Sequence, residues 1–101
     1  MPARKALSKE ERHARRAEVA RKAAAGELRL PEAFREIRQA LGLTQASFAE
    51  RFGLTRLQVI ALEAGKANPT LETLQKIATP FGFQVGFVAR GRADVSGDAG
   101  G

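Results

Sequence analysis

The fold is decided by residues 42–74, GLTQASFAERFGLTRLQVIALEAGKANPTLETL. Two threonines, Thr44 and Thr55, each stand just before a segment with apolar residues at helical spacing, and Gly53 lies between the segments. A threonine side chain caps the start of a helix, and a glycine takes the positive φ that ends one. The stretch therefore predicts two short helices joined by a tight turn.

The spacing inside this stretch suits two helices that cross steeply. Counting Gln45 as position 1, small Ala49 falls at position 5 and Gly53 at position 9. A small residue is needed where the two backbones approach, and a glycine where φ is positive. Apolar residues at three further positions can pack the second helix on the first. They are Leu54, Val59 and Leu62.

Helical patterns continue on both sides of this pair. Ser8 with Glu11 three residues later is a capping box, which predicts a basic helix over residues 8–25. Apolar residues at helical spacing predict a further helix over 31–41 and another over 70–79. The chain is thus expected to be helical almost throughout its first 82 residues.

After residue 82 the pattern changes to alternation. Phe83, Val85 and Phe87 would point to one side of a strand. The rest of the chain is predicted to be helical, so it offers no strand to pair with, and buried unpaired backbone groups are costly. The same strand from a second copy would supply the pairing. We therefore expect a homodimer with these three residues at its interface.

Composition excludes several classes of function. The 101 residues hold 17 Lys+Arg and 11 Asp+Glu, a net charge of +6, which suits a polyanionic partner. With no Cys and one His, neither a zinc site nor a thiol nucleophile is expected. No apolar run approaches the roughly 20 residues that span a bilayer. We expect no enzyme, no cofactor, no metal and no membrane association.

Four motifs together resemble the Cro/Xre family of helix-turn-helix repressors, over roughly residues 31–82. They are Gly-Leu-Thr-Gln at 42–45, Gly-Leu-Thr at 53–55, Leu-Glu-Ala-Gly-Lys at 62–66 and Pro-Thr-Leu-Glu-Thr-Leu at 69–74. The resemblance implies an all-α, five-helix, lambda-repressor-like domain, here with an extra N-terminal basic helix and a C-terminal strand that pairs across a dimer. The expected organisation is a basic arm or helix over 1–30, the DNA-binding domain over 31–82, a dimerisation strand over 83–89 and a disordered tail over 90–101.

The resemblance also implies that the second helix of the pair lies in the DNA major groove. It assigns DNA contacts to Gln45, Thr55, Arg56, Leu57, Gln58, Ala61, Lys66 and Asn68, and a structural ion pair to Arg38 and Glu63. Arg56 suits guanine, and Gln58 suits adenine or phosphate. Leu57 suits a thymine methyl group. Three contact residues lie outside this helix and suit phosphate: Gln45, Lys66 and Asn68.

The chain departs from the family on one side of this helix. Ile60 and Ala61 stand where the family usually has polar residues, and Leu57 and Ala64 join them on the same face. Such a face either reads methyl groups and groove shape or packs against another protein surface. We expect the first, because the surrounding motif is intact.

The expected function is that of a homodimeric repressor of a palindromic operator, with two recognition helices about 34 Å apart. The chain is also similar to HigA/HipB-type antitoxins, so the alternative is an antitoxin that binds a toxin and represses its own operator. In that case the basic helix before Gly26 is the candidate toxin-binding element. The same helix is otherwise expected to be solvated or to contact phosphate. Either function implies a cytoplasmic protein associated with the nucleoid.

Overall fold

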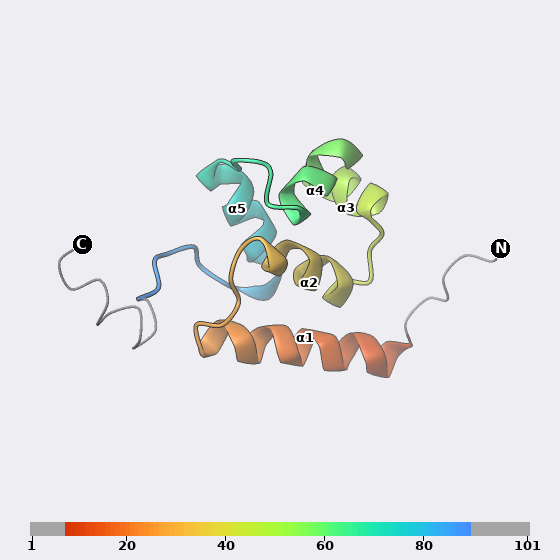
Figure 1. Cartoon of the computed structure of the whole chain (residues 1–101). Helices are drawn as coiled ribbons and strands as arrows, with labels where there is room; N and C mark the ends of the chain where they lie inside the picture. Colours follow the sequence, from red (N-terminus) through yellow and green to blue (C-terminus); the bar gives the residue numbers. More distant parts are fainter. Residues whose placement is uncertain (1–7, 90–101) are drawn as a thin grey trace.

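The structure is a computed structural model that describes residues 8–89. It contains α1 (Lys9–Ala24), α2 (Glu32–Ala40), α3 (Gln45–Phe52), α4 (Arg56–Glu63), α5 (Leu71–Ala78) and a short 3-10 helix (Thr79–Phe81), all drawn in Figure 1. The predicted helices are confirmed to within a residue or two at their ends. Within this described range, no helix is long and apolar enough to cross a membrane. The tail predicted to be disordered, residues 90–101, lies outside the described residues.

The expected number of helices was too high. A five-helix domain with an extra helix requires six, whereas residues 8–89 hold five α-helices, the basic α1 among them. After α5 the chain cannot continue as a helix, because Pro80 lacks a backbone N–H. Gly82 then takes φ +72° and turns the chain away.

The strand expected over residues 83–89 is absent from the single chain that the structure describes. The Phe83 amide donates to the Ala78 carbonyl oxygen at 3.1 Å, and beyond it the segment runs without regular structure. The physical reason is that residues 8–89 offer no strand to pair with this segment. A strand is held by a neighbouring strand, and the helices of this chain provide none.

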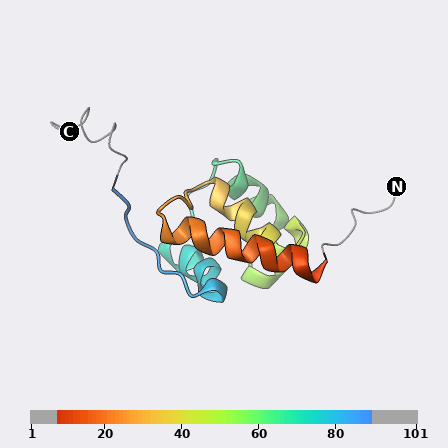
Figure 2. The ribbon, with the colours of Figure 1, turned by 90° about the horizontal axis from the view of Figure 1, so that it is seen from below.

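Helix α2 lies in the middle of the molecule, with α1 on one side and α3, α4 and α5 on the other (Figures 1 and 2). The core forms where these helices meet, and Phe48 and Val59 are its most completely buried large side chains. The other buried members are Val19, Phe34, Ile37, Ala40, Ala49, Phe52, Leu62 and Ile77.

The turn between α3 and α4 follows the local rules expected of it. The Thr44 and Thr55 hydroxyls accept from backbone amides three residues on and so cap both helices. Gly53 takes φ +70°, where an added Cβ would meet nothing within 4 Å, so the backbone conformation rather than space requires glycine. The Leu54 amide closes the turn onto the Ala49 carbonyl oxygen at 2.8 Å, and Ala49 is buried where the helices approach.

Helix α1 packs on α2 with little apolar area. Val19 is the one residue of Lys9–Ala24 that is buried. Polar and cationic contacts also hold the helix, among them Lys22 Nζ to Glu36 Oε1 at 2.9 Å, Arg15 Nη1 to Gln39 Oε1 at 3.0 Å, and the Arg16 guanidinium 4.7 Å from the Phe81 ring centre.

Candidate nucleic-acid interface

Helix α4 is fixed to the core along one side only. Val59 is 0 % exposed and Leu62 is 4 % exposed, and together they anchor the helix. Helical periodicity places the residues at i, i+3, i+4 and i+7 from Leu57 on the opposite side. Leu57 is 75 % exposed, whereas Ile60 and Ala61, expected to be exposed, are half-buried. The outer side of α4 is therefore accessible mainly along its first turn.

The start of α4 and the start of α3 share a cleft of about 350 Å³. Arg56 lines it from α4 and Gln45 from the first turn of α3. Its remaining lining residues are Arg38, Thr44 and Ala46. Two predicted contact residues, Arg56 and Gln45, thus come together, although 11 positions separate them in the sequence. The positive end of the α3 dipole opens on the same place.

A buried polar network ties three helices together beneath this cleft. Arg38 donates to Glu63 from Nε at 2.6 Å and from Nη2 at 3.2 Å, so the ion pair implied by the resemblance is present. Arg38 Nη1 also donates to the Leu43 carbonyl oxygen at 3.0 Å. Both charged side chains are largely buried, at 9 % and 4 % exposed. The network joins α2, the entry to α3 and the end of α4.

Two members of this network were not foreseen. Gln45 Nε2 donates to Glu63 Oε1 at 3.3 Å, so the side chain expected on phosphate is oriented by the ion pair. Arg35 Nε lies 3.8 Å from the same oxygen, with its side chain 64 % exposed. The signal for Arg35 is its position: it stands one helical turn before Arg38 on α2, and so on the same face.

Gln58 takes part in the capping box of α4, and this limits the hydrogen bonds that it can make with DNA. Its Oε1 accepts from the Thr55 backbone amide at 2.8 Å, and its own amide donates to the Thr55 hydroxyl at 3.0 Å. A bidentate contact to adenine needs the carboxamide oxygen and nitrogen together. In the capping box the Gln58 oxygen is directed at the Thr55 amide, so the carboxamide does not present its oxygen and nitrogen together to a base.

The remaining expected contact residues lie at the other end of α4. Lys66 and Asn68 are both exposed in the loop that follows the helix. Gly65, at φ +74°, turns the chain there, and the Lys66 amide bonds to the Ala61 carbonyl oxygen at 2.9 Å. The predicted site is thus split into a cluster at the start of α3 and α4 and a pair of polar residues beyond the end of α4.

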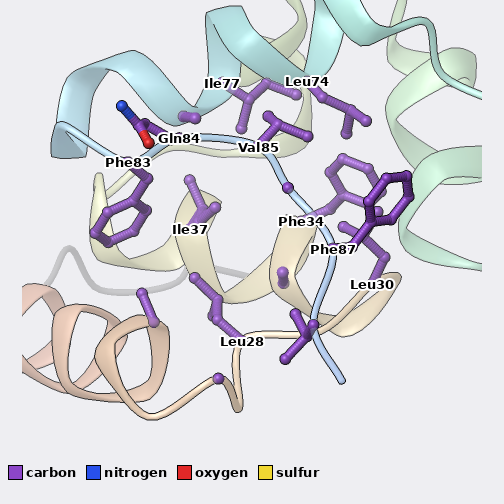
Figure 3. A pocket seen from close by; sticks show the side chains of 16 residues that line it. Leu28, Leu30, Phe34, Ile37, Leu74, Ile77, Phe83, Gln84, Val85 and Phe87 are labelled. Atoms are coloured by element: carbon purple, nitrogen blue, oxygen red, sulfur yellow. The ribbon is translucent and has the colours of Figure 1, made fainter. Parts of the chain in front are cut away.

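The three residues expected at a dimer interface have different surroundings. Phe83 is half-buried in its own chain and stacks on Phe81, with 5.2 Å between ring centres. Val85 is 40 % exposed, and Phe87 is fully exposed. The segment borders an apolar groove of about 300 Å³ between α2 and α5, shown in Figure 3. No residue of α4 lines this groove.

Comparisons with known proteins agree with this geometry. A family model described as helix-turn-helix matches residues 34–87, just over half of the chain, and so begins after α1. A protein of Methanothermobacter thermautotrophicus named an uncharacterized HTH-type transcriptional regulator is 50 % identical over 48 residues, which are 48 % of this chain and 70 % of that protein. No solved structure matches the chain significantly.

Two longer relatives have specific names. The HTH-type transcriptional regulator PuuR of Escherichia coli is 40 % identical over 50 residues, 50 % of this chain and 27 % of its own. The HTH-type transcriptional regulator DdrOP3 of Deinococcus deserti is 38 % identical over 58 residues, 57 % of this chain and 45 % of its own. The matched residues therefore cover less than half of either relative. From the family match and the capped, glycine-turned α3–α4 pair, the chain belongs to the helix-turn-helix family, of the Cro/Xre type that its motifs indicated.

Proposed function

We propose that the chain is a sequence-specific, non-enzymatic DNA-binding transcriptional regulator whose α4 enters the major groove. The observation that carries the proposal is the one-sided anchoring of α4. Val59 and Leu62 hold it to the core, while Arg56 and Leu57 stand exposed in its first turn. A helix so presented fits a groove about 12 Å wide. The regulators named among the relatives support the same function.

Contacts outside α4 would position the protein without reading sequence. The first turn of α3 offers backbone N–H groups at a positive helix end, where phosphate binds favourably. Gln45 stands there, held by Glu63 through its amide nitrogen. Lys66 and Asn68 reach phosphate from the loop beyond α4. Thr55, which caps α4, and Gln58 and Ala61 within the helix complete the contact set.

The regulator is proposed to act as a homodimer on a palindromic operator. Val85 and Phe87 leave apolar surface in water beside the groove between α2 and α5, and Leu30 adds to it at 52 % exposed. The same segment of a second copy would cover this surface and give residues 83–89 the strand partner they lack. Phe83 would contribute less exposed surface to this interface, because it is half-buried against Phe81 of its own chain.

Selection of bound fragments from random DNA tests the function. We expect enrichment of an inverted repeat and an affinity that falls steeply with salt, because phosphates are neutralised. Arg56→Glu should abolish the enrichment. Lys9→Glu is the matched control: it makes the same change in charge on α1, away from α4, and should retain it. A failure to enrich any sequence, or binding indifferent to salt, would refute the proposal.

An antitoxin role is the second candidate, and the placement of α1 favours it. Helix α2 separates α1 from α4, so a toxin on α1 and DNA on α4 would not compete (Figure 1). Purification of the protein from its native host distinguishes the two functions. A small partner protein in stoichiometric amount supports the antitoxin, and the chain recovered alone supports the repressor.

A further inference from the structure

We propose that α4 reads the C5-methyl groups of thymines in the major groove, with Leu57 as the specificity-determining contact. The inference rests on the proposed function and names the base chemistry that α4 recognises. Its starting point is the outer side of α4, where Leu57, Ile60, Ala61 and Ala64 recur at i, i+3, i+4 and i+7. This apolar stripe lies opposite the anchoring residues Val59 and Leu62, and its members Leu57 and Ala64 are exposed whereas Ile60 and Ala61 are half-buried.

An apolar stripe on both sides of a helix is unusual for a surface helix, which ordinarily turns polar residues outward. Leu57, at 75 % exposed, is the large side chain that protrudes most from the outer stripe. Ala61 and Ala64 are short, so they allow the helix backbone to approach the floor of a groove. A leucine presented in this way meets a methyl group favourably and satisfies no hydrogen-bonding group.

The polar residues beside the stripe narrow the choice of base further. Arg56 carries donors only. Gln58 uses its acceptor oxygen in the capping box at 2.8 Å, so it also presents a donor. The major-groove edge of thymine offers one acceptor and a methyl group, and that of guanine offers two acceptors. Adenine offers an acceptor beside a donor and no methyl group, and cytosine offers a donor. A surface of donors and methyl groups therefore complements thymine and guanine.

Charge favours DNA over protein as the occupant of this face. Arg56 flanks the stripe at one end and exposed Lys66 follows it at the other. The cleft beside Arg56 opens on the positive end of α3, whereas the Arg38 guanidinium that also lines it is neutralised by Glu63. A protein interface of ordinary size buries on the order of 800 Å² on each partner. One protruding leucine between cations is a small patch by that measure.

Replacing thymine by uracil tests the inference, because it removes the methyl group and leaves the hydrogen-bonding edge intact. The probe is the duplex enriched from random DNA, synthesised with deoxyuridine at one thymidine position at a time. We expect at least one position where the substitution weakens binding about fourfold, the ratio that corresponds to burying one methyl-sized group. Leu57→Ala should weaken binding to the thymine duplex and bring the thymine-to-uracil ratio at that position to about one.

Arg56→Ala is the matched control, since it should weaken binding to both duplexes and leave the ratio unchanged. Sequence-specific binding that is indifferent to uracil at every position would overturn the inference while leaving the proposed function intact, and so would a ratio that survives Leu57→Ala. A lower sedimentation mass for free Leu57→Ala would place a second copy on this face and also overturn it. If selection enriches no sequence at all, the proposed function fails and the inference fails with it.

Discussion

At the scale of single residues, Arg56 is predicted to specify sequence and Lys66 to add affinity. Arg56 stands in the first turn of α4, where base edges lie within reach of a guanidinium. Arg56→Ala should cost about 1–3 kcal/mol of binding free energy on the preferred duplex and relax discrimination at particular base pairs. Titrations against single-base variants of the selected duplex measure both effects.

Lys66→Ala is the control for this prediction. A phosphate contact carries no sequence information, so its loss should weaken binding evenly across the variants and lower the salt slope by about 1. If Arg56→Ala behaves in the same even manner, Arg56 is a phosphate contact and sequence is read elsewhere on α4.

The buried Arg38–Glu63 pair makes a prediction about stability. Removing one partner leaves the other charge buried, so Glu63→Ala should lower the free energy of unfolding by about 3–5 kcal/mol. Replacing both at once, by Arg38→Met with Glu63→Leu, should cost less than Glu63→Ala alone, because no unpaired charge remains. Urea denaturation of the variants and the parent measures this. Equal losses in the single and double variants would contradict it.

Residue-level rules predicted the caps, Gly53 and Ala49 because each depends on a few neighbours in sequence. They did not predict that Gln45 donates to Glu63, since that contact requires α3 and α4 to be assembled first. Gln58 was assigned a contact with adenine or phosphate, and the limit that its part in the cap of α4 puts on this contact emerges only when its oxygen is seen to accept from the Thr55 amide. Local sequence patterns do not predict contacts between residues that are far apart in the sequence.

At the scale of elements, α1 is predicted to detach more easily than any other helix. It buries one apolar side chain, Val19, and polar or cationic contacts, such as Lys22 with Glu36 and Arg16 with Phe81, join it to α2 and the 3-10 helix. Val19→Asp should therefore release α1 while α2–α5 remain folded. Hydrogen exchange should show amides of residues 9–24 losing protection and those of α3 and α4 retaining it.

Ala20→Asp is the control for α1, because it places the same charge one residue away on an exposed position. It should leave exchange unchanged apart from a small loss of helix propensity. Unfolding of the whole chain by Val19→Asp would mean that α1 belongs to the cooperative core.

Sequence patterns predicted the ends of the helices but not where every element packs or pairs. The ends of α1 were predicted correctly because Ser8 and Gly26 are local signals. The surface on which α1 packs was not, because an alanine-rich helix with one buried valine gives little apolar signal of where it belongs. Alternation after residue 82 predicted a strand, yet alternation specifies only a side-chain pattern, and a strand also needs a partner.

At the scale of the whole molecule, the apolar surface around residues 83–88 predicts the assembly. Phe87 is fully exposed in the single chain, so Phe87→Asp should leave the fold of each copy intact and act only on their association. Sedimentation should report a dimer for the parent and a monomer for Phe87→Asp. Affinity for the inverted repeat should fall in the variant, because each half-site is then bound separately.

A point substitution tests the dimer better than a truncation after residue 82, which would also remove Phe83 from its stack on Phe81 and disturb the monomer. Leu71→Asp is the matched control, since Leu71 is 58 % exposed on α5 and does not line the groove. It should remain dimeric. If Phe87→Asp also stays dimeric, the copies associate through another surface. If the parent is a monomer, the exposed segment has a different partner and an inverted repeat is not required.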